Sequence, residues 1–285
     1  MPNSVTSIGL SAFNGCGSIE SVVIPDGITE IKNYAFKNCN KLANLTMGSG
    51  VSSIGAGAFM NCSALVDVAI PNNVTTVEAN AFSGCTGLEN LVVGDGVTNI
   101  GDEMFSGLTN LASVVIGNGV TKIGNSAFNG CTKLESLVIG SSVLSIGSNA
   151  FEGCTSLADI TLPDSTTSIG NDAFNGCHGL GSITLGNDLT TIGGSAFSGC
   201  SGLQTVAIPN NVTNIGEYAF SECNGLVSVT MGSGVKTVGE KSFYGCDSLS
   251  KVNISDIVAW CRIKFGSHDS NPLFYAHNLY INDVL

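Results

Sequence analysis

Residues 192–214 read IGGSAFSGCSGLQTVAIPNNVTN, and the same pattern recurs at intervals of 23 residues along most of the chain. A fixed short period of this kind predicts a solenoid, in which each repeat buries its apolar face by stacking on its neighbours. We therefore expect a truncated repeat at residues 1–7 and eleven full repeats over residues 8–254. The repeats begin, without an insertion or deletion, at Ile8, Ile31, Ile54, Val77, Ile100, Ile123, Ile146, Ile169, Ile192, Ile215 and Val238.

Each repeat contains two extended segments and one compact turn. The segment L-x-x-V-x-I predicts a short strand with Val206 and Ile208 facing inward. Pro or Gly ends this strand in ten of the eleven repeats, and a second extended segment follows. The A-F-x-G-C run predicts a helical turn that places Phe197 and Cys200 on one side and is closed by a left-handed residue, Gly199. We expect one short parallel strand per repeat on one face, and an extended segment plus a single helical turn on the other.

The inward positions recur as columns, and one column is phenylalanine in every repeat. Each aromatic side chain buries about 150–250 Å² at a defined geometry, so an unbroken column predicts a continuous buried row of stacked rings. The column consists of Phe13, Phe36, Phe59, Phe82, Phe105, Phe128, Phe151, Phe174, Phe197, Phe220 and Phe243.

Ten of the eleven cysteines share a second inward position, which Leu108 takes in the fifth repeat. A position that accepts Cys or Leu is a small apolar site, where a free thiol behaves as a small hydrophobe. A metal site needs ligands that converge on one point, whereas one cysteine per coil gives a line. We therefore expect reduced, buried and unreactive thiols at Cys16, Cys39, Cys62, Cys85, Cys131, Cys154, Cys177, Cys200, Cys223 and Cys246.

The fifth repeat departs from the pattern at two inward positions. It carries Met104 where most repeats have Ala, and Leu108 where the others have Cys. Because the two lie four residues apart on one side of the turn, together they overfill the site. We expect this coil to shift outward, or else to carry a local strain of about 1–3 kcal/mol.

Composition and charge exclude several classes of function. The formal net charge is −12, which opposes nucleic acid and anionic membranes as partners. Apolar runs are interrupted in every repeat, so no membrane-spanning stretch of about 20 residues exists and we expect no membrane insertion. His178, His268 and His277 are scattered, and Cys261 has no zinc-type spacing with them. We predict no enzyme, no cofactor and no metal, because no nucleophile, base or paired carboxylates converge.

The pattern L-x-x-V-x-I-P-x-x-V-T-x-I-G-x-x-A-F-x-G-C resembles the 23-residue leucine-rich repeats of the BspA-like class, from Pro2 to about Ile254. The resemblance implies a leucine-rich repeat solenoid of the α/β type, coiled as a right-handed superhelix. It also implies a large cell-surface or secreted protein that adheres to host tissue or to other microbes. Its partners would then be proteins or glycoconjugates on those surfaces, at an extracellular or cell-surface location. The resemblance offers no catalytic residues to transfer.

Residues 255–285 leave the repeat pattern and hold the only Trp of the chain. Open solenoid ends expose core side chains and strand edges, so terminal units are expected to be atypical. We interpret the segment as an irregular C-terminal cap, or as a unit between two arrays of repeats.

The outward strand positions are the candidate binding face. No Trp, Tyr or Arg occurs in either outward row of the eleven repeats, although such residues dominate most binding hot spots. A face of small residues fits either weak contacts spread over many coils, or a structural spacer that projects another domain. The candidate row is Ser21, Asn44, Asp67, Asn90, Ser113, Ser136, Asp159, Ser182, Thr205 and Ser228.

Overall fold

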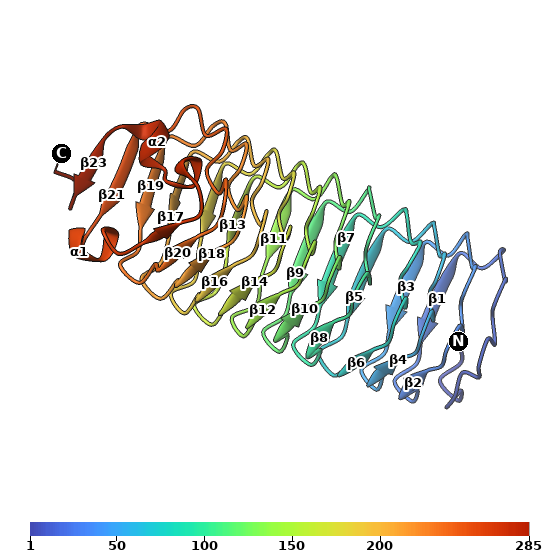
Figure 1. Ribbon diagram of the computed structural model, residues 1–285. Helices are drawn as coiled ribbons and strands as arrows, with labels where there is room; N and C mark the ends of the chain where they lie inside the picture. The colour runs from blue at the N-terminus through green and yellow to red at the C-terminus, as the bar shows by residue number, and fades with distance from the viewer. Residues whose placement is uncertain (285) are drawn as a thin grey trace. The chain divides into compact units, whose positions relative to one another are not determined.

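The computed structural model describes residues 1–284 and divides into two compact units, Met1–Ser142 and Val143–Leu285. Each unit is described by itself. In both, successive coils stack so that each coil contributes a longer strand to one parallel ladder and a two-residue strand to a second ladder (Figure 1). The predicted parallel-strand solenoid is confirmed.

In the first unit the longer strands pair in parallel, in the register set by the 23-residue period, as in the pairing of Ser21 with Asn44. The ladder is interrupted once, between β3 and β5, and the short ladder once, between β6 and β8. The longer strands are β1 (Ser21–Ile24), β3 (Asn44–Met47), β5 (Asp67–Ile70), β7 (Asn90–Val93), β9 (Ser113–Ile116) and β11 (Ser136–Val138). The short strands are β2 (Glu30–Ile31), β4 (Ser53–Ile54), β6 (Thr76–Val77), β8 (Asn99–Ile100) and β10 (Lys122–Ile123).

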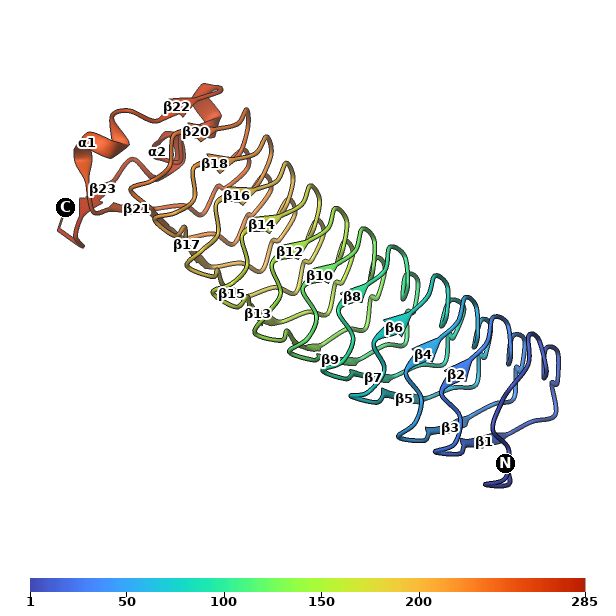
Figure 2. The same ribbon diagram turned by 90° about the horizontal axis from the view of Figure 1, so that it is seen from below.

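In the second unit both ladders run without interruption, and the short strands are well seen in Figure 2. The longer strands are β13 (Asp159–Thr161), β15 (Ser182–Thr184), β17 (Thr205–Ala207), β19 (Ser228–Met231), β21 (Lys251–Ile254) and β23 (Leu279–Ile281). The short strands are β12 (Ser145–Ile146), β14 (Ser168–Ile169), β16 (Thr191–Ile192), β18 (Asn214–Ile215), β20 (Thr237–Val238) and β22 (Lys264–Phe265).

The phenylalanine column forms the centre of the core in each unit. In the second unit consecutive ring centroids lie 5.3–5.4 Å apart and the rings are nearly parallel. Every ring from Phe36 to Phe243 is fully buried, as predicted. Phe13, in the first coil, is only half-buried.

The turn that follows the second extended segment differs in form from the predicted helical turn. In the ninth repeat it is a series of tight turns in which both Ser195 and Gly199 are left-handed, with φ of 51° and 70°. The N–H groups of Ser195, Phe197 and Gly199 donate to carbonyls of the next coil at 2.7–2.8 Å. Backbone groups that an α-helix would satisfy within itself are thus satisfied between coils. Within residues 1–284, α-helix and 3-10 helix occur only after residue 256.

The thiol column has a hydrogen-bonding role in addition to filling space. The Sγ of Cys62 donates to the carbonyl of Phe36 at 3.1 Å, and Cys85 and Cys200 bond to Phe59 and Phe174 in the same way. All eleven cysteines are free thiols. Burial raises the pKa of the Cys85 and Cys131 thiols to about 12.

The fifth coil is displaced in the way that its larger side chains predict. Met104 and Leu108 are both buried, and the rings of Phe82 and Phe105 lie 6.1 Å apart at 22°, whereas the ring pairs on either side are 5.3 Å apart. Other coils bond across this turn, as in the 2.9 Å hydrogen bond from Phe105 N–H to the carbonyl of Ala127. Within residues 1–284, the N–H of Phe82 makes no equivalent bond to Met104. The interruption between β6 and β8 falls at the same place.

Residues 255–284 form a longer coil that continues both ladders. β22 pairs with β20, and β23 pairs with β21 through Val252 and Leu279, which are 27 residues apart instead of 23. The extra residues lie between β21 and β22, where the chain forms α1 (Ile257–Trp260). The segment from β22 to β23 has the ordinary length and contains the 3-10 helix η1 (His268–Ser270) and α2 (Leu273–Ala276).

The divergence of this coil begins at Asp256. In several earlier coils the side chain at the same position accepts a backbone N–H of the next coil, as Asn210 does from Ser233 at 3.0 Å. The carboxylate of Asp256 instead accepts the N–H groups of Val258 and Ala259 and caps α1. The chain therefore enters a helix where a repeat would continue into its second extended segment.

Candidate interaction surface

The structure places the predicted row on the outward face of the longer strands. In the first unit Asp67 pairs with Asn90, and Asn90 with Ser113, so that the row stays in register. In the second unit the row continues from Asp159 to Ser228. Ser113 and Ser228 are half-buried, and the other eight predicted residues are exposed.

Neighbouring side chains of this row form hydrogen bonds where they are long enough to reach the next coil. The Nδ2 of Asn90 donates to Oδ1 of Asp67 at 2.7 Å across β5 and β7. Serine side chains elsewhere in the row are too short to bridge coils about 4.8 Å apart. The row can offer hydrogen bonds to a partner, but no side chain in it is large enough to fill a pocket on that partner.

The neighbouring outward row differs between the two units. In the first it is largely aliphatic, and Val23, Val92 and Val138 are 44–53% exposed. In the second it is largely hydroxylated and continues from Thr161 into β19 and β21. The first unit therefore presents a flat apolar strip, and the second a flat polar one.

The interruption between β3 and β5 opens a groove on the face of the first unit. Its volume is about 390 Å³, and Asn44 and Asp67 of the predicted row both line it. Leu45, which an intact ladder would bury, is partly exposed there. The sequence of β3 and β5 obeys the repeat pattern, so the groove is not marked in the sequence.

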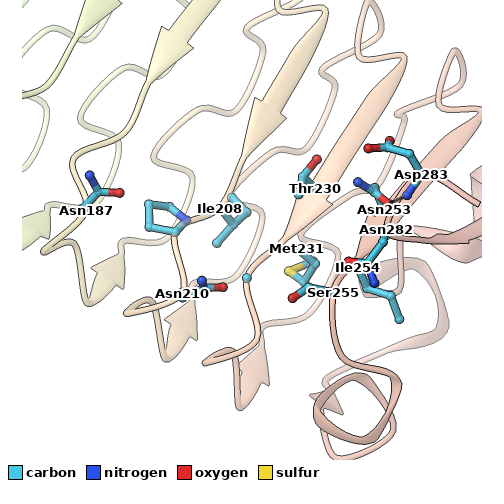
Figure 3. Close-up of a pocket in the computed structure, with 12 residues that line it drawn as sticks. Asn187, Ile208, Asn210, Thr230, Met231, Asn253, Ile254, Ser255, Asn282 and Asp283 are labelled. Atoms are coloured by element: carbon cyan, nitrogen blue, oxygen red, sulfur yellow. Dashed lines mark hydrogen bonds between the residues drawn. The ribbon is translucent and has the colours of Figure 1, made fainter.

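A second groove lies within the second unit, at the C-terminal ends of β17, β19 and β21 (Figure 3). Its volume is about 430 Å³. Four successive coils and the turn after β23 contribute its polar lining. The polar side chains are Asn187, Asn210, Thr230, Asn253, Ser255, Asn282 and Asp283.

The wall contributed by residues 282 and 283 is held by the backbone. Asn282 and Asp283 are both left-handed, with φ of 50° and 64°, and join Ile281 to Val284 in a two-residue antiparallel turn. Asn and Asp tolerate this conformation better than most residues. The N–H of Asp283 also donates to Oδ1 of Asn253 at 3.1 Å, which fixes the turn against β21.

A tyrosine lies beside this groove on the strand face. Tyr280 pairs with Asn253, so its side chain continues the outward row that Thr230 and Asn253 occupy. The Nζ of Lys251 lies 4.8 Å from the ring centroid and forms an ion pair with Asp283 at 2.7 Å. The strand face thus has an aromatic residue, contributed by the coil that follows the regular repeats.

Sequence reasoning missed both the groove and Tyr280. The 23-residue pattern predicts outward rows only as far as β21, because residues 255–285 do not follow the repeat. Four additional residues displace the last strand and hide its register. The alternation of Leu279, Tyr280 and Ile281 was the available signal.

Within residues 1–284, no group of three or more His, Cys, Asp or Glu side chains is placed to hold a metal ion. His178 contacts the carbonyl of Gly199 at 2.8 Å, and His268 packs against the ring of Phe274. Over the same residues, no helix combines the length and hydropathy needed to cross a bilayer.

A parallel ladder with one strand, one tight-turn segment and one stacked ring per 23 residues defines a leucine-rich repeat solenoid. The family model described as the BspA type leucine rich repeat region matches residues 1–112, 75–204 and 145–261, in six copies. The chain therefore belongs to the BspA-type leucine-rich repeat family, a fold and a family that are typically non-enzymatic. No curated protein sequence matches the chain.

Several solved structures are similar. A leucine-rich cell-surface protein of Faecalibacterium prausnitzii is 29% identical, with 91% of this chain and 86% of that chain covered, at a TM-score of 0.44. A leucine-rich repeat protein of Bacteroides ovatus is 25% identical, with 92% and 87% covered, at a TM-score of 0.47. The pneumococcal vaccine antigen PcpA is 21% identical, with 94% and 75% covered, at a TM-score of 0.48.

Proposed function

We propose that the chain is a non-catalytic adhesion module of a cell-surface or secreted protein, which binds proteins or glycoconjugates through its strand face. The observation that carries the proposal is the row from Ser21 to Ser228, which stays outward and mostly exposed, and which is in register along each uninterrupted stretch of its ladder. Membership of a leucine-rich repeat family is compatible with protein interaction. The cell-surface assignment draws support from the description of the Faecalibacterium protein as a cell-surface protein.

The small side chains of the face favour distributed binding. Individual contacts with Ser, Asn or Thr are weak, and linked weak contacts gain affinity through effective concentration. A surface coated with the protein should therefore retain a partner, such as epithelial or bacterial cells, that the soluble monomer binds barely or not at all.

Single substitutions on the face test this proposal. Asp67→Ala, Asn90→Ala and Ser113→Ala should each change the retention of cells on a coated surface only slightly. The matched control is Thr86→Ala, an exposed residue on the turn side of the fourth repeat. Loss of retention through one face substitution would refute distributed binding and indicate a discrete site.

The alternative is a structural spacer that projects another domain of a larger surface protein. The observation that favours it is the absence of Trp, Tyr and Arg from the outward rows of the eleven repeats. Retention no better than that on an inert coated protein would favour the spacer over the adhesion module.

A further inference from the structure

The groove at the C-terminal ends of β17, β19 and β21 differs from the rest of the strand face because it is concave. Its volume, about 430 Å³, falls in the range of about 300–1,000 Å³ that is usual for small-ligand sites. Ile208, Met231 and Ile254, whose side chains are almost fully buried, lie at its base. Polar side chains surround that base, as Figure 3 shows.

Many of these polar groups have no protein partner. Within residues 1–284, the side chains of Thr230, Ser255 and Asn282 make no hydrogen bond to the protein. Asn210 and Asn253 use only their Oδ1 atoms, toward Ser233 and Asp283, and leave their Nδ2 groups free. The groove therefore offers hydroxyl groups, amide donors and amide acceptors close together.

Two of the amides are oriented before any ligand arrives. The Oδ1 of Asn210 accepts both the N–H and the hydroxyl of Ser233, at 3.0 and 3.3 Å. The Oδ1 of Asn253 is held by the N–H of Asp283. Side chains that are already ordered in the free protein lose less conformational freedom on binding, which favours ligand affinity at this groove.

The groove carries no unpaired charge. Asp283 is its one ionisable lining residue among those described, and its carboxylate is paired with the ammonium of Lys251 at 2.7 Å. An ionic ligand would find no free counter-charge. An apolar ligand would leave the amides and hydroxyls unpaired, which is costly.

The position of the groove argues against an extended peptide. Peptides that add to a sheet pair with the free edge of an outer strand. The groove instead lies across the ends of β17, β19 and β21, which are interior strands of their ladder. A neutral ligand with many hydroxyl groups fits the lining best.

From these observations we infer that the groove binds a short, uncharged saccharide. Its hydroxyl groups pair with Asn210, Thr230, Asn253 and Asn282, and its less polar ring face lies over the base. This inference goes beyond the proposed function, because such a groove can bind a free sugar even if the strand face retains no partner.

The test uses the full chain with maltose, lactose and cellobiose as probes, each added separately. Saturation-transfer NMR detects contact, and titration of the sugar into labelled protein measures Kd. Thr230→Val removes a hydroxyl without changing shape, and Asn282→Gly removes an amide while keeping the left-handed backbone. Each should raise Kd about threefold to tenfold, the usual range for one hydrogen bond.

The matched control is Thr184→Val, on an exposed residue of the same outward row that does not line the groove. It should leave Kd unchanged, and the unfolding midpoints of all three variants should match that of the parent protein. Absence of saturation transfer from all three sugars, or equal weakening by Thr184→Val, overturns the inference. Binding of neutral tetra-alanine at the groove in place of sugar also overturns it. Retention of cells on a coated surface is measured in parallel, so that failure of the groove is distinguishable from failure of the adhesion proposal.

Discussion

The fifth repeat provides a quantitative test of how the core is packed. Met104→Ala combined with Leu108→Cys gives this repeat the residues that most other repeats have at the same positions. We expect the coil to close onto its neighbour, with the 6.1 Å spacing between the rings of Phe82 and Phe105 approaching the 5.3 Å found between Phe105 and Phe128.

The expected gain in stability follows from what closure restores. The N–H of Phe82 and the thiol introduced at position 108 each regain an acceptor, and each bond contributes about 0.5–1.5 kcal/mol net. Relief of overpacking contributes about 1–3 kcal/mol. Against these stands the transfer free energy of the five side-chain heavy atoms removed, about 0.8 kcal/mol each or about 4 kcal/mol in all, which is lost even when the coil closes and no cavity remains. Gains of about 2–6 kcal/mol therefore leave the double variant within about 2 kcal/mol of the parent protein.

Urea unfolding of four proteins measures this difference: the parent, the two single variants and the double variant. Each single variant should be less stable than the parent, since the remaining large side chain keeps the coil open and leaves a void. The double variant should be more stable than either single variant, so the coupling between the sites is large. The reciprocal control is Ala127→Met with Cys131→Leu, which places the same two large side chains in the sixth repeat. It should introduce the same overpacking strain there. A double variant destabilised by the sum of the single effects would refute the reasoning.

Two further predictions concern the thiols and the last coil. Because burial raises the pKa of Cys85 and Cys131 from the ordinary value of 9.0 to about 12, the folded state keeps protons that the unfolded state releases. The thiol contribution to the free energy of unfolding should thus be fully present below pH 9 and be lost as the pH rises from 9 to 12. The midpoint of urea unfolding should fall over the same range. Rapid native labelling of most thiols at pH 8, rather than of exposed Cys261 and half-buried Cys16, would contradict this. Asp256→Ala should cost about 0.5–2 kcal/mol through loss of the α1 cap, with exposed Asp247→Ala as the control, and an equal effect of the two would argue against the cap.

The inward columns were predictable because burial imposes one residue type per position. Phe197, Cys200, Val206 and Ile208 are all buried where the pattern placed them. The left-handed residue at Gly199 was predictable for a related reason, since Gly tolerates positive φ.

The second left-handed position gave no such signal. It holds residues as different as Tyr34, Glu103 and Ser195, because hydrogen bonds to the next coil maintain its conformation without glycine. Tertiary contacts determine the backbone there, so the turn resembled a helical one in sequence.

The sequence predicted which side chains form the candidate face, but it did not predict the grooves in that face. Alternation along the strands identified which side chains point outward, and Ser21, Asn44 and Asp67 do so. The grooves depend on ladder interruption and on how the last coil folds back, which no single repeat encodes. Asn282 and Asp283 reach the face only because their turn is bonded to Asn253.

The most direct test of the adhesion proposal is a deletion series within the first unit. Removal of residues 31–76, two complete repeats of the eleven, keeps the 23-residue register and shortens the face. If binding is distributed along the strand face, retention of cells on a coated surface should fall roughly in proportion to the length removed. Unchanged retention, or its complete loss in a variant that still folds, would contradict distributed binding.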